Sequence, residues 1–303
     1  MDGSGIGGDV RALQSELDDV VVRVASPSAR SLKFSSSSPD FVAALSTLEL
    51  VITNLGSPES HLAEAASQSF GSHREQFRND LADYGRLRAV SRLGVPPFGQ
   101  PSDFTDPLLA YASADDEMIR LYARTSARLD PAVWSGDVLV AAVQNLMHSI
   151  FNEVSLDVAH RSVSVTGRAD RAIVDALTAI VHHDQASLDH SIADLSAAYR
   201  RSIWIRERYR GLNRVPVLAI GLSALAFDRG LHVPEESLAP AAADYLQWLT
   251  NRPGPLRLRT YTGHASLLNP LITDPANHIP RVRLNLDRAW LTSARGGSHR
   301  NNI

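Results

Sequence analysis

Cysteine is absent from this chain of 303 residues. Disulfides, thiolate metal sites and cysteine nucleophiles are therefore excluded, and the absence suits the reducing cytosol. An excess of charge of one sign is also lacking, because 33 acidic and 30 basic residues give a formal net charge of −3. Nucleic-acid-binding proteins usually carry a basic excess, so the sequence predicts no nucleic-acid partner. Lysine is nearly missing too: Lys33 is the only one, and arginine supplies the other cations.

Long hydrophobic runs are missing as well. The longest uncharged apolar stretch, residues 215–227, has 13 residues, whereas a membrane-spanning helix needs about 20. The first eight residues contain neither a basic nor an apolar segment, so we expect no signal peptide and a cytoplasmic location. No nucleophile elbow, phosphate-binding loop or dinucleotide fingerprint is present either. The sequence therefore gives no sign of a membrane partner or of a common cofactor.

The strongest signals that are present mark helix starts. A capping side chain precedes a proline at Ser38, Ser57, Asp106 and Asp130. Such a side chain accepts from free backbone N–H groups, and proline at the first helical position loses nothing by lacking its own. The fold predicted from these signals is all-α, either an irregular helical bundle or a short stack of αα-hairpins. The expected helices cover residues 9–24, 39–55, 58–93 (with a break at Gly71 as an alternative), 107–113, 115–129, 136–160, 170–183, 185–210, 216–229 and 237–251.

A stretch rich in proline and glycine, residues 94–106, cannot form a helix and is the best candidate for a linker. It predicts a helical N-terminal region of residues 1–93 and a helical C-terminal core of residues 107–262. Residues 263–303 are expected to form an extended or partly disordered tail, and one continuous domain is the alternative. Residues 256–261 alternate leucine and arginine, which predicts a short strand or an extended arm.

Two segments of the sequence, residues 111–124 and 180–194, are weakly similar to each other. Each reads as a helix end, an acidic turn at Asp115 or Asp184, and a second amphipathic helix. Paired helices of this kind build helical stacks, although an irregular bundle explains the pattern equally well. Asp116 and Glu117 extend the first acidic turn, and we expect them to complement a helix dipole rather than to bind magnesium.

The densest group of potential metal ligands lies around His183 and Asp184. An adjacent His–Asp pair is typical of the all-helical metal-dependent phosphohydrolases, in which His148 or His160 and Asp228 would supply the remaining ligands. The preferred interpretation is that His183 ends one helix and Asp184 caps the next. The sequence therefore predicts no cofactor, no metal and no catalytic residue, with the phosphohydrolase as the rival hypothesis.

Arginine and aromatic residues alternate between residues 200 and 214. Four of these residues, Arg201, Trp204, Arg208 and Tyr209, are of the types that dominate protein interfaces and form a candidate partner-binding face. The same types could stack on nucleic-acid bases. Alternatively, Trp204 packs inward while the guanidinium groups stay in water.

Residues 217–227 are uncharged and apolar on every face, so they predict a helix that is surrounded by other helices. Small residues such as Gly221 would let neighbouring helices approach closely. Asp228 and Arg229 end the apolar run, and we expect them to organise the helix end by capping or as a buried ion pair. Gly230 occupies the position of a left-handed C-terminal cap.

This part of the chain resembles the immunity protein 49 family, which is found beside polymorphic toxins in bacteria, particularly actinobacteria. The family pattern is an apolar helix ending in Ala-x-Asp-Arg-Gly, a short valine-containing link and a helix carrying Tyr-Leu. The counterparts here are residues 226–230, residues 231–233 and the pair Tyr245–Leu246. The resemblance implies a non-catalytic, cytoplasmic immunity protein that binds and neutralises one cognate toxin protein. The metal-dependent phosphohydrolase and a helical adaptor or regulatory protein remain the alternatives.

Overall fold

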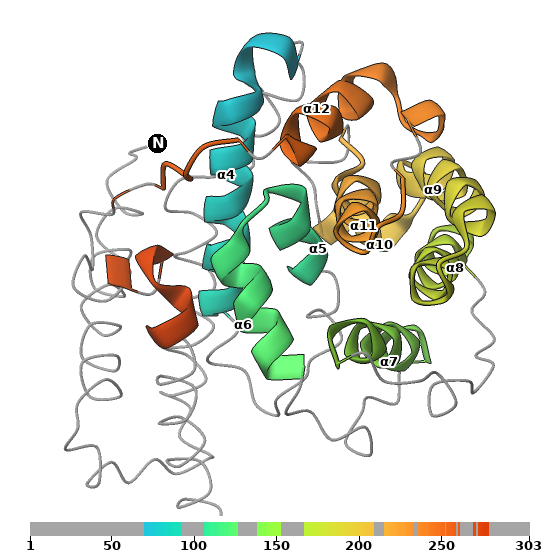
Figure 1. Cartoon of the computed structure of the whole chain (residues 1–303), viewed down its shortest axis with the longest axis horizontal. Helices are drawn as coiled ribbons and strands as arrows, with labels where there is room; N and C mark the ends of the chain where they lie inside the picture. The colour runs from blue at the N-terminus through green and yellow to red at the C-terminus, as the bar shows by residue number, and fades with distance from the viewer. Residues whose placement is uncertain are drawn as a thin grey trace, which may run out of the picture. The chain divides into compact units, whose positions relative to one another are not determined.

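A computed structural model gives the fold of the chain. It describes residues 70–91, 106–126, 138–152, 167–208, 215–232, 235–251, 253–258, 260, 269–270 and 272–278. The secondary structure in these ranges is helical and contains no strand, which confirms the all-α prediction (Figure 1). The labelled helices are α4 (Phe70–Ser91), α5 (Asp106–Ala112), α6 (Asp116–Ser126), α7 (Val138–Asn152), α8 (Arg168–His182), α9 (Gln185–Tyr199), α10 (Ile203–Arg208), α11 (Val217–Asp228), the 3-10 helix η7 (Glu235–Ser237) and α12 (Pro240–Thr250).

The chain divides into two compact units. The larger joins residues 58–85 to residues 97–258, and the smaller joins residues 1–57, 86–96 and 259–303. The domain ranges expected from the sequence stay a prediction, because residues 92–105 of the expected linker lie outside the described residues. In the smaller unit several residues between 269 and 278 are helical, where a tail without helices was expected. Arg86 of this unit is buried and donates to the carbonyl oxygen of Ile272.

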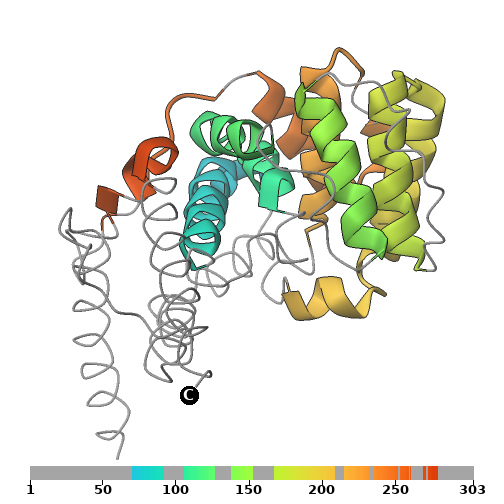
Figure 2. The same ribbon diagram turned by 90° about the horizontal axis from the view of Figure 1, so that it is seen from below.

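Helices α5, α6, α8, α11 and α12 lie within a few residues of their predicted ranges. Parts of the expected helices 58–93 and 136–160 lie outside the described residues. The expected helix 185–210 instead ends at Tyr199 and resumes as α10 after a turn. The carbonyl of Ala198 accepts the N–H groups of both Arg201 and Ser202 in that turn, at 2.9 and 3.1 Å. Figure 2 shows the short gold helix α10 running across, rather than along, α8 and α9. With this change of direction, Ile205 of α10 is completely buried. Tertiary packing of this kind overrides helix propensity, which would favour continuing α9.

Several other expectations can be compared with the structure. Gly71 does not break α4, which begins at Phe70 and continues to Ser91. Of residues 256–261, which were expected to form a strand or an extended arm, residues 256–258 and 260 are described, and they are neither helix nor strand. The helix starts at Ser38, Ser57 and Asp130, and the expected helices 9–24 and 39–55, lie outside the described residues.

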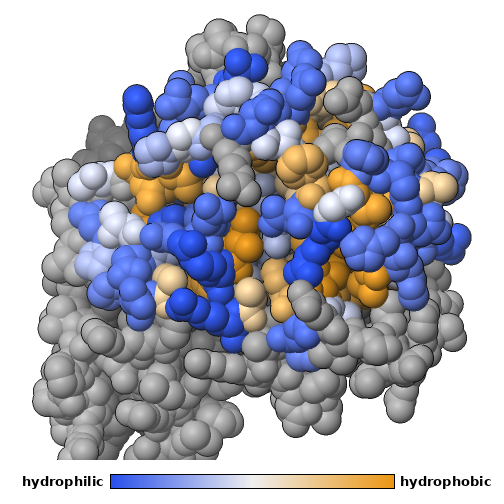
Figure 3. Space-filling view, viewed as in Figure 1, coloured by the Kyte–Doolittle hydropathy of each residue, from blue (hydrophilic) through white to orange (hydrophobic). Residues whose placement is uncertain are grey.

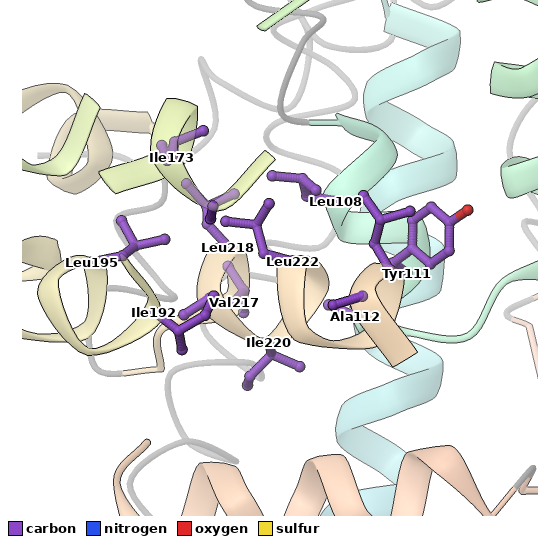
Figure 4. Packing of buried hydrophobic residues seen from close by; sticks show 14 of the residues in the cluster. Leu108, Tyr111, Ala112, Ile173, Ile192, Leu195, Val217, Leu218, Ile220 and Leu222 are labelled. Atoms are coloured by element: carbon purple, nitrogen blue, oxygen red, sulfur yellow. The ribbon is translucent and has the colours of Figure 1, made fainter. Parts of the chain in front are cut away.

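Helix α11 is buried, as predicted. Nine of its 12 residues are buried, including every residue from Val217 to Ser223. Consecutive helices from α5 to α9 pack in order, and α11 packs against α5, α8, α9 and α12. Figure 4 shows α11 between Leu108 of α5 on one side and Ile173, Ile192 and Leu195 of α8 and α9 on the other. Burial of side chains on every face explains why this segment can be apolar throughout.

The backbones of α5 and α11 approach each other closely at Gly221 of α11. A β-carbon at this position would lie 2.8 Å from the carbonyl carbon of Leu108 and closer still to its oxygen, whereas real β-carbons essentially never approach within 3.0 Å. The backbones of α5 and α11 therefore touch here, and glycine is the one residue type that fits.

The end of α11 has the geometry that the sequence predicts. Gly230 has a φ of 81°, in the left-handed region. The N–H of Leu231 donates to the carbonyl of Ala226, and the N–H of Gly230 to that of Phe227, each at 3.0 Å. These two bonds define a Schellman motif, in which glycine avoids the strain that a side chain would meet at this φ.

The same motif ends α5 and α8, with Ala114 at a φ of 46° and His183 at 53° in place of glycine. In both cases the next residue is an aspartate that caps the following helix. Asp115 accepts from the backbone N–H of Met118 at 3.2 Å, and Asp184 has the equivalent role at the start of α9. The two hairpins α5–α6 and α8–α9 therefore share one turn geometry. This shared turn explains the weak similarity between the two segments of the sequence.

Candidate functional site

The His183–Asp184 pair forms a helix boundary. His183 is the left-handed residue after α8, and Asp184 is the N-cap of α9. One carboxylate oxygen of Asp184 accepts from the backbone N–H of Ser187 at 3.1 Å, and the other accepts from the Ser187 hydroxyl at 2.6 Å. These hydrogen bonds, the hydroxyl bond first, lower the pKa of Asp184 below its usual value. Both oxygens thus serve the helix end, as the preferred interpretation expected.

The other members of the hypothetical metal site do not join this pair. Within the described ranges, no three His, Asp or Glu side chains come together to hold a metal ion. His148 contacts the side-chain amide of Asn152 at 3.0 Å, and Asp228 is exposed at the end of α11. His160 lies outside the described residues. The pair therefore gains no further ligand from the part of the chain that the structure describes.

The Asp228–Arg229–Gly230 motif acts through its backbone. Asp228 is exposed and Arg229 is half-buried, so a pair between either of them and a neighbour would not be buried. The reason is the position of the motif at the exposed end of α11, where Phe227 is also 47% exposed. Burial, followed by the charge of Asp228, raises the pKa of Tyr111 on α5, which places Asp228 near that phenol. Gly230 is the member that determines local structure, through its left-handed cap.

The candidate partner-binding residues divide between core and surface. Arg201 is exposed. Trp204 is half-buried against the core, and its Nε1 donates to Asp170 of α8 at 2.6 Å. The inward-packing alternative is therefore the one that the structure shows for Trp204. Nothing is described for the Arg208 side chain or for Tyr209.

Next to Trp204 lies a residue that the sequence analysis passed over. Ile203 is 63% exposed, and it is one of two large hydrophobic residues exposed in the described ranges. The arginines Arg168, Arg171, Arg200 and Arg201 are exposed at the same end of the α8–α9 hairpin. We call Ile203, Trp204 and these four arginines the α8–α10 corner. The sequence did not predict this surface, because residues 185–210 were expected to form one straight helix. The turn before α10 changes which side chains face outward.

Two polar contacts hold the α8–α10 corner together. Arg168 donates to Asp194 of α9 at 2.8 Å, joining the start of α8 to α9. This hydrogen bond is the main cause that lowers the pKa of Asp194. The Trp204–Asp170 bond joins α10 to the first turn of α8. Asp170 and Asp194 are thus engaged with donors of the corner itself, and exposed Asp175 lies near Arg171. Arg200 and Arg201 give the surface its basic character.

A buried polar cluster was also missed. Arg78 of α4 is 4% exposed and donates from Nε to Ser113 O at 2.9 Å and from Nη1 to Gly254 O at 2.6 Å. Tyr245 of α12 is fully buried and donates to Ala112 O at 2.8 Å. Burial lowers the pKa of Arg78 and raises that of Tyr245. The cluster satisfies carbonyls at the end of α5, so its chemistry is structural.

The surface in view contains no large apolar area. Figure 3 shows hydrophobic residues emerging in several small areas among hydrophilic ones. Surface areas of this size are ordinary for a folded domain. No helix among the described residues is long and apolar enough to cross a bilayer.

Comparison with known proteins gives no relative for this chain: no family model, no curated protein and no solved structure matches it. The resemblance of residues 216–246 to the immunity protein 49 family therefore stays a prediction. The structure adds that Gly230 and Tyr245, which carry part of that resemblance, hold α11 and α5 in place.

Proposed function

We propose that this chain is a non-catalytic immunity protein that binds a cognate polymorphic toxin in the cytoplasm and neutralises it. The observation that carries the proposal is the α8–α10 corner, where Ile203 is 63% exposed beside exposed arginines. Isolated exposed apolar residues are ordinary. An apolar side chain within a group of arginines and a tryptophan, however, has the composition of an interface hot spot.

A second line of support comes from how the polar residues are used. Asp115 and Asp184 cap helices, Arg78 and Tyr245 satisfy the end of α5, and Asp170 holds Trp204. These side chains are engaged in building a helical scaffold, which is what a protein that acts by binding requires. The resemblance of residues 216–246 supplies the toxin as the partner class.

We expect a toxin gene beside that of this chain, and the test is co-expression with the toxin domain that it encodes. We expect the chain to restore growth of cells that make the toxin domain, and the two purified proteins to form a stoichiometric complex by calorimetry. Cell death in the presence of soluble chain, together with no heat of binding, would contradict the proposal.

Elemental analysis separates this proposal from the phosphohydrolase hypothesis. A binding protein should purify without stoichiometric metal under conditions that preserve metal sites. Iron, manganese or zinc at one equivalent or more, lost in the His183→Ala variant, would favour the enzyme instead.

A further inference from the structure

We infer that the α8–α10 corner is the surface that binds the partner protein. The partner presents an acidic surface around an apolar pocket that receives Ile203. This inference rests on the proposed function and adds the location and the chemistry of the interface.

The apolar centre of the corner is Ile203. Its neighbours in sequence are anchored, since Ile205 is fully buried and Trp204 packs against the core. Ile203 is held outward by a segment that is itself fixed. Its side chain is 63% exposed, and burying that apolar surface against a partner would favour association.

The charge around this centre is positive although the chain as a whole carries −3. Arg200 and Arg201 lie directly before α10, and Arg168 lies in the first turn of α8. Of the nearby carboxylates, Asp194 is bound by Arg168, Asp170 accepts from Trp204, and exposed Asp175 lies near Arg171. The surplus of positive charge therefore comes from Arg200 and Arg201. A basic surface attracts an acidic one, which raises the association rate and excludes partners of the wrong charge.

The corner is also rigid, which lowers the entropy lost on binding. Contacts at 2.8 Å between Arg168 and Asp194 and at 2.6 Å between Trp204 and Asp170 tie three helices together. The segment that carries Ile203 is therefore held in place against α8.

A protein partner fits these observations better than a nucleic acid does. Binding of single strands relies on exposed aromatic rings that stack on bases. Here the indole is half-buried with its N–H engaged, and the exposed centre is an aliphatic side chain. An aliphatic anchor surrounded by arginines matches a protein surface that has carboxylates around a pocket.

The experiment measures the affinity of the toxin domain for the full chain and for four variants by calorimetry. Ile203→Asp and Arg201→Glu change the α8–α10 corner. Phe227→Asp and Arg120→Glu are the matched controls, because Phe227 is the other exposed large hydrophobic residue and Arg120 is an exposed arginine of α6. Thermal melting confirms that each variant is folded.

We expect Ile203→Asp to weaken binding by about 30-fold or more, the scale of a hot spot. Arg201→Glu should weaken it by about tenfold and reduce its dependence on salt. Both controls should bind like the wild type. Equal binding by all five proteins would overturn the inference and leave the proposed function intact, whereas failure of the wild type to bind would overturn both. Binding of a DNA duplex that Arg201→Glu abolishes, with toxin binding unchanged, would show that the corner binds a polyanion and would also overturn the inference.

Discussion

The contact between α5 and α11 at Gly221 leads to a quantitative prediction. Alanine is favoured over glycine inside a helix by about 1 kcal/mol. At Gly221, however, the added β-carbon would collide with the backbone of Leu108, 2.8 Å from its carbonyl carbon. Backbone cannot rotate away as a side chain can, so we take the upper end of the usual cost of overpacking, about 3 kcal/mol. The Gly221→Ala variant should therefore lose about 2 kcal/mol of unfolding free energy.

The assay is urea denaturation followed by far-ultraviolet circular dichroism. The matched control is Gly85→Ala in α4, where a β-carbon would lie 3.8 Å from that of Leu109, an ordinary contact. This control should gain about 0.5–1 kcal/mol, because only the helix-propensity term remains. A second check is Leu108→Ala combined with Gly221→Ala, which should not restore stability because the collision is with backbone. If Gly221→Ala raised the denaturation midpoint as Gly85→Ala does, the reasoning about close helix contact would be refuted.

Four further predictions concern helix ends and the buried polar cluster. Tyr245→Phe leaves the Ala112 carbonyl without its donor and should cost about 1–3 kcal/mol in urea denaturation. Burial raises the pKa of Tyr245 from its usual 10.0. The unfolded chain then loses this proton first, and the free energy of unfolding should fall as the pH rises above 10; Tyr245→Phe should weaken that dependence. Arg78→Met leaves the carbonyls of Ser113 and Gly254 without their donor and should lower the free energy of unfolding by about 3 kcal/mol or more. Arg78→Lys should not restore that stability, because a single ammonium group cannot reach both carbonyls. Gly230→Ala should lower the melting temperature by more than Arg229→Ala does, since the first forces a side chain into a φ of 81° at about 1–2 kcal/mol and the second removes a half-buried side chain.

Features that depend on neighbours in sequence were predicted well. The cap at Gly230 and the N-caps at Asp115 and Asp184 depend on interactions within about five residues, so the local sequence predicts them. The burial of α11 was predicted from its uniformly apolar composition. The close contact at Gly221 also follows from composition, because a run of small residues in an apolar helix indicates near approach of another backbone.

Features that depend on distant residues were not predicted. Nothing near Arg78 in sequence shows that its guanidinium meets the carbonyl of Gly254, 176 residues away. The break before α10 was missed because residues 185–210 all have acceptable helix propensity, and burial of Ile205 decides the turn. The exposure of Ile203 follows from that turn, so the candidate site could be predicted only in part, through Arg201 and Trp204.

The bonds from Arg78 and Tyr245 to the end of α5 have a consequence for the order of folding. The donor and acceptor of the Tyr245 bond are 133 residues apart, and Gly254 follows Tyr245. A growing chain has already made α5 and α6 when these later segments emerge from the ribosome, and contacts across such separations form late. We expect the α5–α6 hairpin to stay loosened until α12 and Gly254 have been made, so that this part of the core is locked only after 133 further residues have followed Ala112.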